Sequence, residues 1–468
     1  MRNTKYLKYS FVCILTCFLM LAPGCTPREF CGQPEDMQFE EIPPLTPELK
    51  ADIYYDASYS MVGFVNPGNS YYVRTLQLLE RSFISGWPES TTEDYQYYQF
   101  GTTIDRISRD KALNAVFAEF YNDPDFLEET RIEYVIDKVD KGNLTIIITD
   151  LFQNAADVNL LIGKLNRKIL SKDMSVGVLG IKSHFNGRVW DVGLEKFNFE
   201  YYTAGKEPVE FRPFYIFMIG KYTDIAHYYK MMNVNGLDSF PEKNFLIFSP
   251  QLVERLASFE NSEIKRSKIK EVRNILRNNS INRHVKQFNV DNNSSKHYVD
   301  ISIKLSFLDY IPNFNPQKLN LETTAWHWSE MPDNQQDNPK NNKKGKSVQK
   351  KKLVCSEKAL RALTIKDIKL LDSQLKFRAA VYPKNFPADG TYCFKIVFRL
   401  PSESYSLPRW VFQWDMDQNL IYHWQQNPTQ FQGNTTLNLK NFLNNIWQII
   451  YQKHKPKIAK LYCYIKRG

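Results

Sequence analysis

Short apolar runs alternate with amphipathic segments over the first half of the chain. Leu144–Ile148 is apolar apart from the β-branched Thr145, a pattern typical of a strand buried on both faces. Arg131–Val139 places its apolar residues at helical spacing. Repetition of such runs and helices is typical of a parallel sheet covered by helices. We therefore expect an α/β fold with a doubly wound, mostly parallel sheet over residues 48–235.

The pattern changes after this region. Apolar and polar residues alternate over Ile301–Phe307, and the alternation returns over Phe394–Leu400. Such alternation indicates half-buried strands, so we expect a β-rich, sandwich-like domain over residues 295–468. A helical stripe of apolar residues over Leu439–Ile450 is expected to pack in a core. Residues 236–294 include a charged segment with a helical pattern, which predicts a helical linker region.

The composition limits the class of protein. Hydrophobic residues make up 43% of the 468 residues and charged residues 24%, which excludes wholesale disorder and a multi-span membrane protein. At roughly 100 to 200 residues per domain, this length predicts about two to four domains. Residues 332–352 have almost no apolar side chains, so we expect a disordered loop there. The net charge of +10 is too small and too dispersed to indicate a nucleic-acid partner.

A basic N-terminal segment precedes the apolar run Phe11–Ala22, which predicts a signal peptide over residues 1–24. The run is shorter than the about 20 apolar residues that a spanning helix needs. Leu21–Cys25 resembles the lipobox of bacterial lipoproteins, which implies lipidation of Cys25 and a lipid-anchored protein of the bacterial cell envelope, periplasmic or surface-facing. An ordinary cleaved signal is the alternative. Residues 25–47 are rich in Pro and Glu and are expected to form a tether.

Four cysteines follow Cys25, and four cysteines allow three disulfide connectivities. Export would permit such pairing, while burial as small hydrophobic side chains is the alternative. The chain has no C-x-x-C motif and no Cys/His cluster, so zinc is not expected. The four are Cys31, Cys355, Cys393 and Cys463.

Polar side chains follow the first apolar run directly. Asp56, Ser58 and Ser60 occupy alternate positions, and alternate residues of an extended loop point the same way. Three oxygen-bearing side chains can therefore meet at one point. Oxygen ligands suit a hard cation such as Mg²⁺, or Mn²⁺ in its place. In an open α/β sheet, ligands bind at the carboxyl ends of the strands, where this loop would lie.

This motif resembles the metal-ion-dependent adhesion site of the von Willebrand factor type A (vWA) domain. That family has the pattern D-x-S-x-S, often continued as M-x-G. The matching residues are Asp56, Ser58, Ser60, Met61 and Gly63.

Three further residues extend the resemblance. The family places a T-D pair after a later strand, matched here by Thr149-Asp150, with Leu151 in place of the usual glycine. A threonine about 20 residues earlier completes the family's site, and Thr130 stands 20 residues before Asp150. Glu128-Glu129 replace the glycines that usually precede that threonine. Thr102 and Thr103 are the competing candidates.

The resemblance implies how the site acts. In the family, the serines and the threonine touch the metal directly, and the aspartates act largely through water. A Glu or Asp of a partner protein fills the open position. We therefore expect an envelope protein that binds a protein partner or a surface through Mg²⁺, with Tyr59 either facing the partner or packing locally. The expected metal ligands are Asp56, Ser58, Ser60, Thr130 and Asp150.

Two alternatives differ in class. One is an envelope scaffold that needs no metal. The other is a Mg²⁺-dependent phosphoester hydrolase, which needs more acidic ligands, such as Asp105 or Glu128-Glu129. The chain has no G-x-S-x-G, H-E-x-x-H, P-loop or G-x-G-x-x-G motif, and its seven histidines are scattered, with His327-Trp328 and His423-Trp424 expected in strands. We therefore expect a protein that is not an enzyme, without catalytic residues.

Overall fold

The fold is known from a computed structural model. The described residues are 44–151, 158–190, 198–250, 270–271, 286–290, 296–304, 310, 315–330, 351–371, 374–400, 406–454 and 457–468. The predicted signal peptide, Cys25, most of the tether and most of the predicted disordered loop lie outside these residues. Within them, no helix has both the length and the apolar character needed to cross a bilayer.

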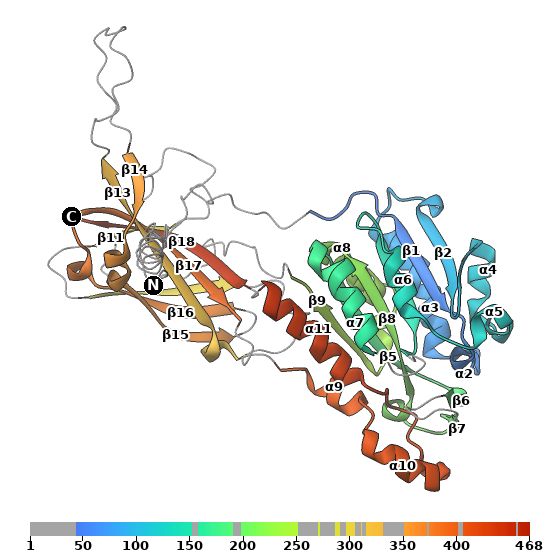
Figure 1. Ribbon diagram of the computed structural model, residues 1–468. Helices are drawn as coiled ribbons and strands as arrows, with labels where there is room; N and C mark the ends of the chain where they lie inside the picture. The colour runs from blue at the N-terminus through green and yellow to red at the C-terminus, as the bar shows by residue number, and fades with distance from the viewer. Residues whose placement is uncertain are drawn as a thin grey trace, which may run out of the picture.

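The N-terminal half is an α/β unit built on a seven-stranded sheet (Figure 1). The α/β class that the sequence predicts is thus confirmed. Four strands, β1, β2, β4 and β5, run in one direction and the other three run in the opposite direction. In order across the sheet, the strands are β3 (Ile104–Ile107), β2 (Tyr95–Phe100), β1 (Ala51–Asp56), β4 (Leu144–Thr149), β8 (Arg212–Gly220), β5 (Ser175–Ser183) and β9 (Lys243–Phe248).

Strand β8 gives the sheet its mixed character. It lies between β4 and β5 and is antiparallel to both. Between β5 and β8, the described chain forms a small hairpin of β6 (Asn186–Trp190) and β7 (Asn198–Tyr202) rather than a crossover helix. A parallel neighbour requires a crossover connection, whereas an antiparallel neighbour does not. The apolar run of β8 is buried on both faces, so its composition alone does not distinguish the two directions.

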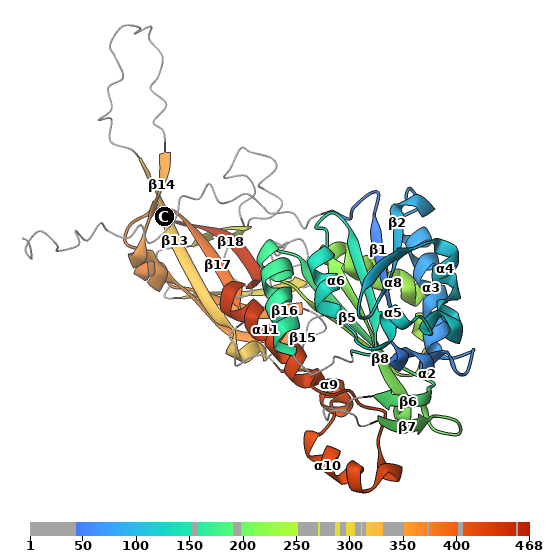
Figure 2. The same ribbon diagram turned by 45° about the vertical axis from the view of Figure 1, so that its right-hand side comes forward.

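Helices cover both faces of this sheet (Figures 1 and 2). On one face lie α3 (Tyr71–Gly86) and α8 (Tyr222–Val234), which pack on each other. On the other lie α6 (Ile132–Lys138) and α7 (Val158–Lys164). Successive residues of β4 alternate between the two cores, as a strand requires. Three shorter helices lie in the connections between strands: α2 (Val62–Val65), α4 (Arg109–Leu113) and α5 (Pro124–Leu127).

The C-terminal half is β-rich, as predicted. Its two sheets meet where the rings of Phe377 and Phe398 lie 5.0 Å apart. The smaller sheet has the order β12 (His297–Lys304), β16 (Gln374–Val381) and β15 (Leu363–Leu371). The larger sheet has the order β10 (Lys270–Glu271), β11 (Lys286–Val290), β18 (Lys457–Arg467), β17 (Gly390–Arg399), β13 (Asn320–Glu330) and β14 (Lys351–Cys355).

Several segments differ from the sequence-based expectations. The sheet of the first half continues to β9, past the expected boundary at residue 235, because the apolar end of that strand is buried against β5. In the predicted helical linker region, strands β10 and β11 are also described. Lys351 and Lys352, at the end of the predicted disordered loop, belong to β14. Among the described cysteines, Cys393 and Cys463 are buried and free, and Cys355 is disulfide-bonded. Cys31 lies outside the described residues.

Three helices between β17 and β18 leave the β-rich half, and the first and third of them pack against the first sheet. They are α9 (Arg409–Trp414), α10 (Gln418–Gln426) and α11 (Leu439–His454). Both views show α11 beside α7 (Figures 1 and 2). Its apolar stripe is buried, as predicted, and Phe442 meets Phe217 of β8 edge-on at 5.7 Å. His423-Trp424 lies in α10 and not in a strand, because Asp417 caps a helix start there; His327-Trp328 lies in β13, as expected.

The chain entering β1 is fastened at the amino edge of the sheet. Thr46 donates from its backbone N to Asp224 Oδ1 at 3.0 Å and from Oγ1 to Asp224 Oδ2 at 2.7 Å. Its carbonyl oxygen accepts a hydrogen bond from Trp87 Nε1 at 2.8 Å. Asp224 lies in the first turn of α8, where a carboxylate is favoured by the helix dipole. The start of the α/β unit is therefore held by α8 and by the residue that follows α3.

Candidate functional site

Two neighbouring parallel strands end at the same edge of the sheet. Asp56 is the last residue of β1, and Asp150 directly follows β4. The strands are in register, with Tyr55 beside Ile148, so both aspartates emerge side by side. This is the carboxyl edge, opposite to the edge that holds Thr46.

The loop after β1 folds back on its own aspartate. Ser58 donates to Asp56 Oδ1 from its backbone N at 3.0 Å and from its Oγ at 2.6 Å. Asp commonly forms such a turn with the residue two positions ahead. Ser60 Oγ lies 3.1 Å from Ser58 Oγ and donates to Asp150 Oδ1 at 3.3 Å. The loop therefore connects the two carboxylates through two hydroxyls.

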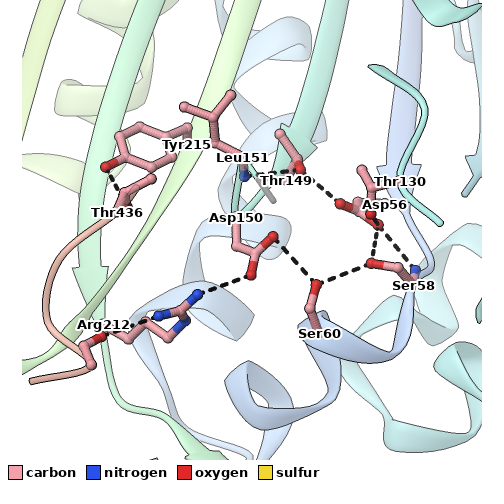
Figure 3. A network of polar contacts seen from close by, with 11 residues as sticks. Asp56, Ser58, Ser60, Thr130, Thr149, Asp150, Leu151, Arg212, Tyr215 and Thr436 are labelled. Atoms are coloured by element: carbon pink, nitrogen blue, oxygen red, sulfur yellow. Dashed lines mark hydrogen bonds and ion pairs between the residues drawn. The ribbon is translucent and has the colours of Figure 1, made fainter. Parts of the chain in front are cut away.

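Thr130 completes the set. Its Oγ1 donates to Asp56 Oδ1 at 3.4 Å. The competing Thr103 donates instead to the carbonyl oxygen of Asp125, at 3.4 Å, and the buried hydroxyl of Thr102 has no hydrogen-bond partner among the described residues. The structure thus brings together all five predicted residues, Asp56, Ser58, Ser60, Thr130 and Asp150 (Figure 3).

Two residues outside the expected set of metal ligands also contact the site. Thr149 Oγ1 donates to Asp56 Oδ2 at 2.7 Å and accepts from the backbone N of Leu151 at 3.1 Å. Arg212, the first residue of β8, donates from Nη2 to Asp150 Oδ2 at 3.2 Å. A charged residue at the start of an apolar strand was a signal in the sequence. Its position beside Asp150 depends on the insertion of β8, which the sequence did not predict.

The two carboxylates of this cluster are buried and repel each other. Each of the five residues has at most 4% of its surface exposed. Removal from water is the larger cause that raises the pKa of Asp56, to about 7, and repulsion from the Asp150 carboxylate is the second. Hydrogen bonds from Ser58 and Thr149 lower this pKa and offset part of the rise. A cation placed among these oxygens would relieve the repulsion. Arg212, itself buried, already supplies one positive charge at Asp150.

Close packing fixes the loop that carries the serines. A Cβ atom on Gly63 would lie 2.4 Å from the ring of Phe185, so this glycine is needed where the chain meets the end of β5. Tyr59 is 44% exposed and meets Trp190 of β6 edge-on at 5.6 Å. Tyr59 therefore packs locally while part of its side chain faces solvent.

The donor set fits a hard divalent cation. Two carboxylates and three hydroxyls offer only oxygen ligands, as Mg²⁺ and Mn²⁺ prefer. In the part of the chain that the structure describes, no group of three or more His, Cys, Asp or Glu side chains is placed to hold a metal. Two of the additional carboxylates considered for a hydrolase face solvent or pair with another residue. Asp105 is exposed on β3, and Glu129 pairs with Arg131 at 2.5 Å.

Comparisons with protein-family models, with characterised proteins and with solved structures found no match to this chain. The resemblance to the vWA domain therefore rests on the sequence motif alone.

Proposed function

We propose that this protein is a lipid-anchored bacterial envelope protein that binds an acidic group of a partner protein or surface through a Mg²⁺- or Mn²⁺-dependent site of the vWA type. The observation that carries this proposal is the convergence of five oxygen-bearing side chains from separate segments at the carboxyl edge of one sheet. Lipidation of Cys25 would supply the anchor.

The residues have distinct tasks in this proposal. Ser58, Ser60 and Thr130 would hold the metal with Asp56 and Asp150. When bound, the metal supplies positive charge and an open position for a carboxylate of the partner. Thr149 and the backbone N of Ser58 orient the Asp56 carboxylate through hydrogen bonds of 2.7 and 3.0 Å.

The exposed Tyr59 is the first contact that a partner would meet. It lies between Ser58 and Ser60 on the same loop, and its ring is braced against Trp190. An aromatic side chain that is partly exposed and held in place is a common anchor in protein recognition. The partner's acidic side chain would pass beside it to reach the buried oxygens.

A metal-independent envelope scaffold is the second candidate. The ion pair of Arg212 with Asp150 favours it, because the guanidinium gives that buried carboxylate a cation without any metal. In this alternative the serines serve as turn and helix caps.

Calorimetric titration of Mg²⁺ and Mn²⁺ into the full chain separates the two candidates. We expect saturable binding by the wild type, loss of binding in Asp56→Ala, and unchanged binding in Asp105→Ala. The Asp105 variant is the matched control, because it removes an exposed carboxylate on β3 and not a buried carboxylate of the cluster. A folded wild type that binds neither metal at millimolar concentration would contradict the metal-dependent function and favour the scaffold.

A further inference from the structure

Arg212 connects the candidate site to the C-terminal half of the chain. Its Nη2 donates to Asp150 Oδ2 at 3.2 Å (Figure 3). Its Nη1 donates to the carbonyl oxygen of Gly433, also at 3.2 Å. Its Nε finds no hydrogen-bond partner among the described residues. One guanidinium thus joins a carboxylate of the site to a backbone carbonyl more than 200 residues away in sequence.

The guanidinium is confined on its other sides. Arg212 pairs with Ser183 of β5, and its Cζ lies 5.3 Å from the centre of the Phe185 ring. The Asp150 side chain is fully buried and that of Arg212 is 7% exposed. A buried ion pair resists loss of either partner, because the remaining charge is left without compensation. In this conformation Arg212 therefore neutralises Asp150.

Residues 431–436, which we call the docked segment, hold the Gly433 carbonyl in place. Phe431 stacks on Phe199 of β7 with the ring centres 4.5 Å apart. Gly433 lies against Tyr201, where a Cβ atom would come within 2.5 Å of the ring. Thr436 Oγ1 lies 2.9 Å from the hydroxyl of Tyr215. The docked segment is thus fastened at both ends and at its centre.

We propose that Arg212 and a divalent cation compete for Asp150, and that this competition couples occupancy of the site to release of the docked segment. The inference rests on the proposed metal-dependent function and deepens it, because it names an internal regulator of the same site.

The coupling follows from charge. A cation among the site oxygens repels the guanidinium at Asp150 in a buried environment, where screening by water is weak. Weaker pairing at Asp150 frees Arg212 to move, and its bond to Gly433 weakens with it. The effect is reciprocal: undocking of the segment removes one of the two bonds that hold Arg212, and so raises the affinity of the site for metal.

Calorimetry with Mn²⁺ on the full chain tests the competition. Arg212→Gln removes the charge, and Gly433→Ala drives the docked segment away from Tyr201. We expect Arg212→Gln to bind Mn²⁺ about ten-fold more tightly than wild type, and Gly433→Ala about five-fold more tightly, within the usual range of coupling between sites. Arg188→Gln, an exposed arginine on β6, and Gly68→Ala, a glycine with open space around it, are the matched controls and should bind as wild type.

Hydrogen exchange of the wild type gives a second measurement that needs no variant. Saturating Mn²⁺ should speed exchange at the backbone N of Thr436, which donates to the Trp414 carbonyl at 2.7 Å, and at that of Met416, which donates to the Thr436 carbonyl at 2.9 Å. This readout decides the matter if Arg212→Gln fails to fold.

The outcomes separate the two proposals. In one outcome, the wild type binds the metal, Asp56→Ala does not, Arg212→Gln binds it with wild-type affinity, and hydrogen exchange does not change. That outcome overturns the competition and leaves the proposed function standing. Binding by the wild type that becomes tighter in Arg212→Gln, with faster exchange on metal binding, supports the competition. Absence of binding in every folded variant overturns both.

Discussion

Leu151 adopts a backbone conformation that suits glycine. Its φ is +63°, in the left-handed region, directly after the site residue Asp150. A non-glycine residue there costs roughly 1–2 kcal/mol. The turn is retained because the Leu151 N–H bonds to Thr149 Oγ1 and the side chain is buried in the core. Leu151 therefore accepts a strained backbone in return for apolar packing of its side chain.

The left-handed backbone of Leu151 predicts that glycine is a more stable replacement there than alanine, the reverse of the usual order in a helix. Leu151→Ala and Leu151→Gly both lose the buried side chain, but only glycine relieves the backbone. We expect Leu151→Gly to be more stable than Leu151→Ala by about 1 kcal/mol, measured as free energies of unfolding in urea.

The control is Leu161, which is buried at an ordinary position of α7. There the glycine variant should be less stable than the alanine variant by about 1 kcal/mol. The same order at both positions would contradict the assigned strain at Leu151.

At the scale of elements, the loop after β1 depends on the end of β5. The ring centre of Phe64 lies 4.9 Å from that of Phe185, and Arg212 Cζ lies 5.3 Å from the same Phe185 centre. Gly63 lies against this ring as well. The ring is fully buried, so it has little room to yield. The serine-bearing loop, the chain leading to β6 and Arg212 therefore form one packed group.

We expect Gly63→Ala to destabilise the protein by about 1–3 kcal/mol through overpacking, measured by urea unfolding. Gly68→Ala, in open space on the same stretch of chain, should change stability by less than about 0.5 kcal/mol. Equal stability of the two variants would show that Phe185 yields freely.

The elements also explain which parts of the site the sequence could predict. Asp56, Ser58 and Ser60 belong to one contiguous loop, so their meeting depends only on local chain geometry. Asp150 follows a strand whose composition identifies it as buried. Arg212 could not be assigned in this way, because its position depends on long-range pairing of β8, and an apolar run buried on both faces fits either direction.

At the scale of the whole molecule, the two halves share a core. A single cluster of buried apolar residues runs from β8 and α7 through α11 to β17 and β18. The apolar stripe of α11 was predictable from its spacing, but the sheet that it covers was not, because a helical period specifies a buried face without specifying its partner. The expected division at residues 236–294 therefore does not describe how the core is built.

A shared core predicts cooperative unfolding. Phe442 of α11 is buried against Phe217 of the first sheet. We expect Phe442→Ala to lower stability by about 3–5 kcal/mol and to leave one unfolding transition, seen at the same urea concentration by circular dichroism and by tryptophan fluorescence.

Asn444→Ala, on the exposed side of the same helix, is the control and should change stability by less than about 0.5 kcal/mol. Two separate transitions, of which the phenylalanine variant shifts only one, would mean that the halves unfold independently.

The hydrogen bonds that hold Thr46 have a mechanical consequence. The incoming chain is fastened at the amino edge of the sheet, while the candidate site lies at the carboxyl edge. A tensile load between the two would run along β1, the strand that connects them. β1 is paired over Ala51–Asp56 with β2 and over Ala51–Tyr55 with β4. Such a load shears both ladders of hydrogen bonds at once instead of opening them one by one, and this geometry suits a strand that transmits force.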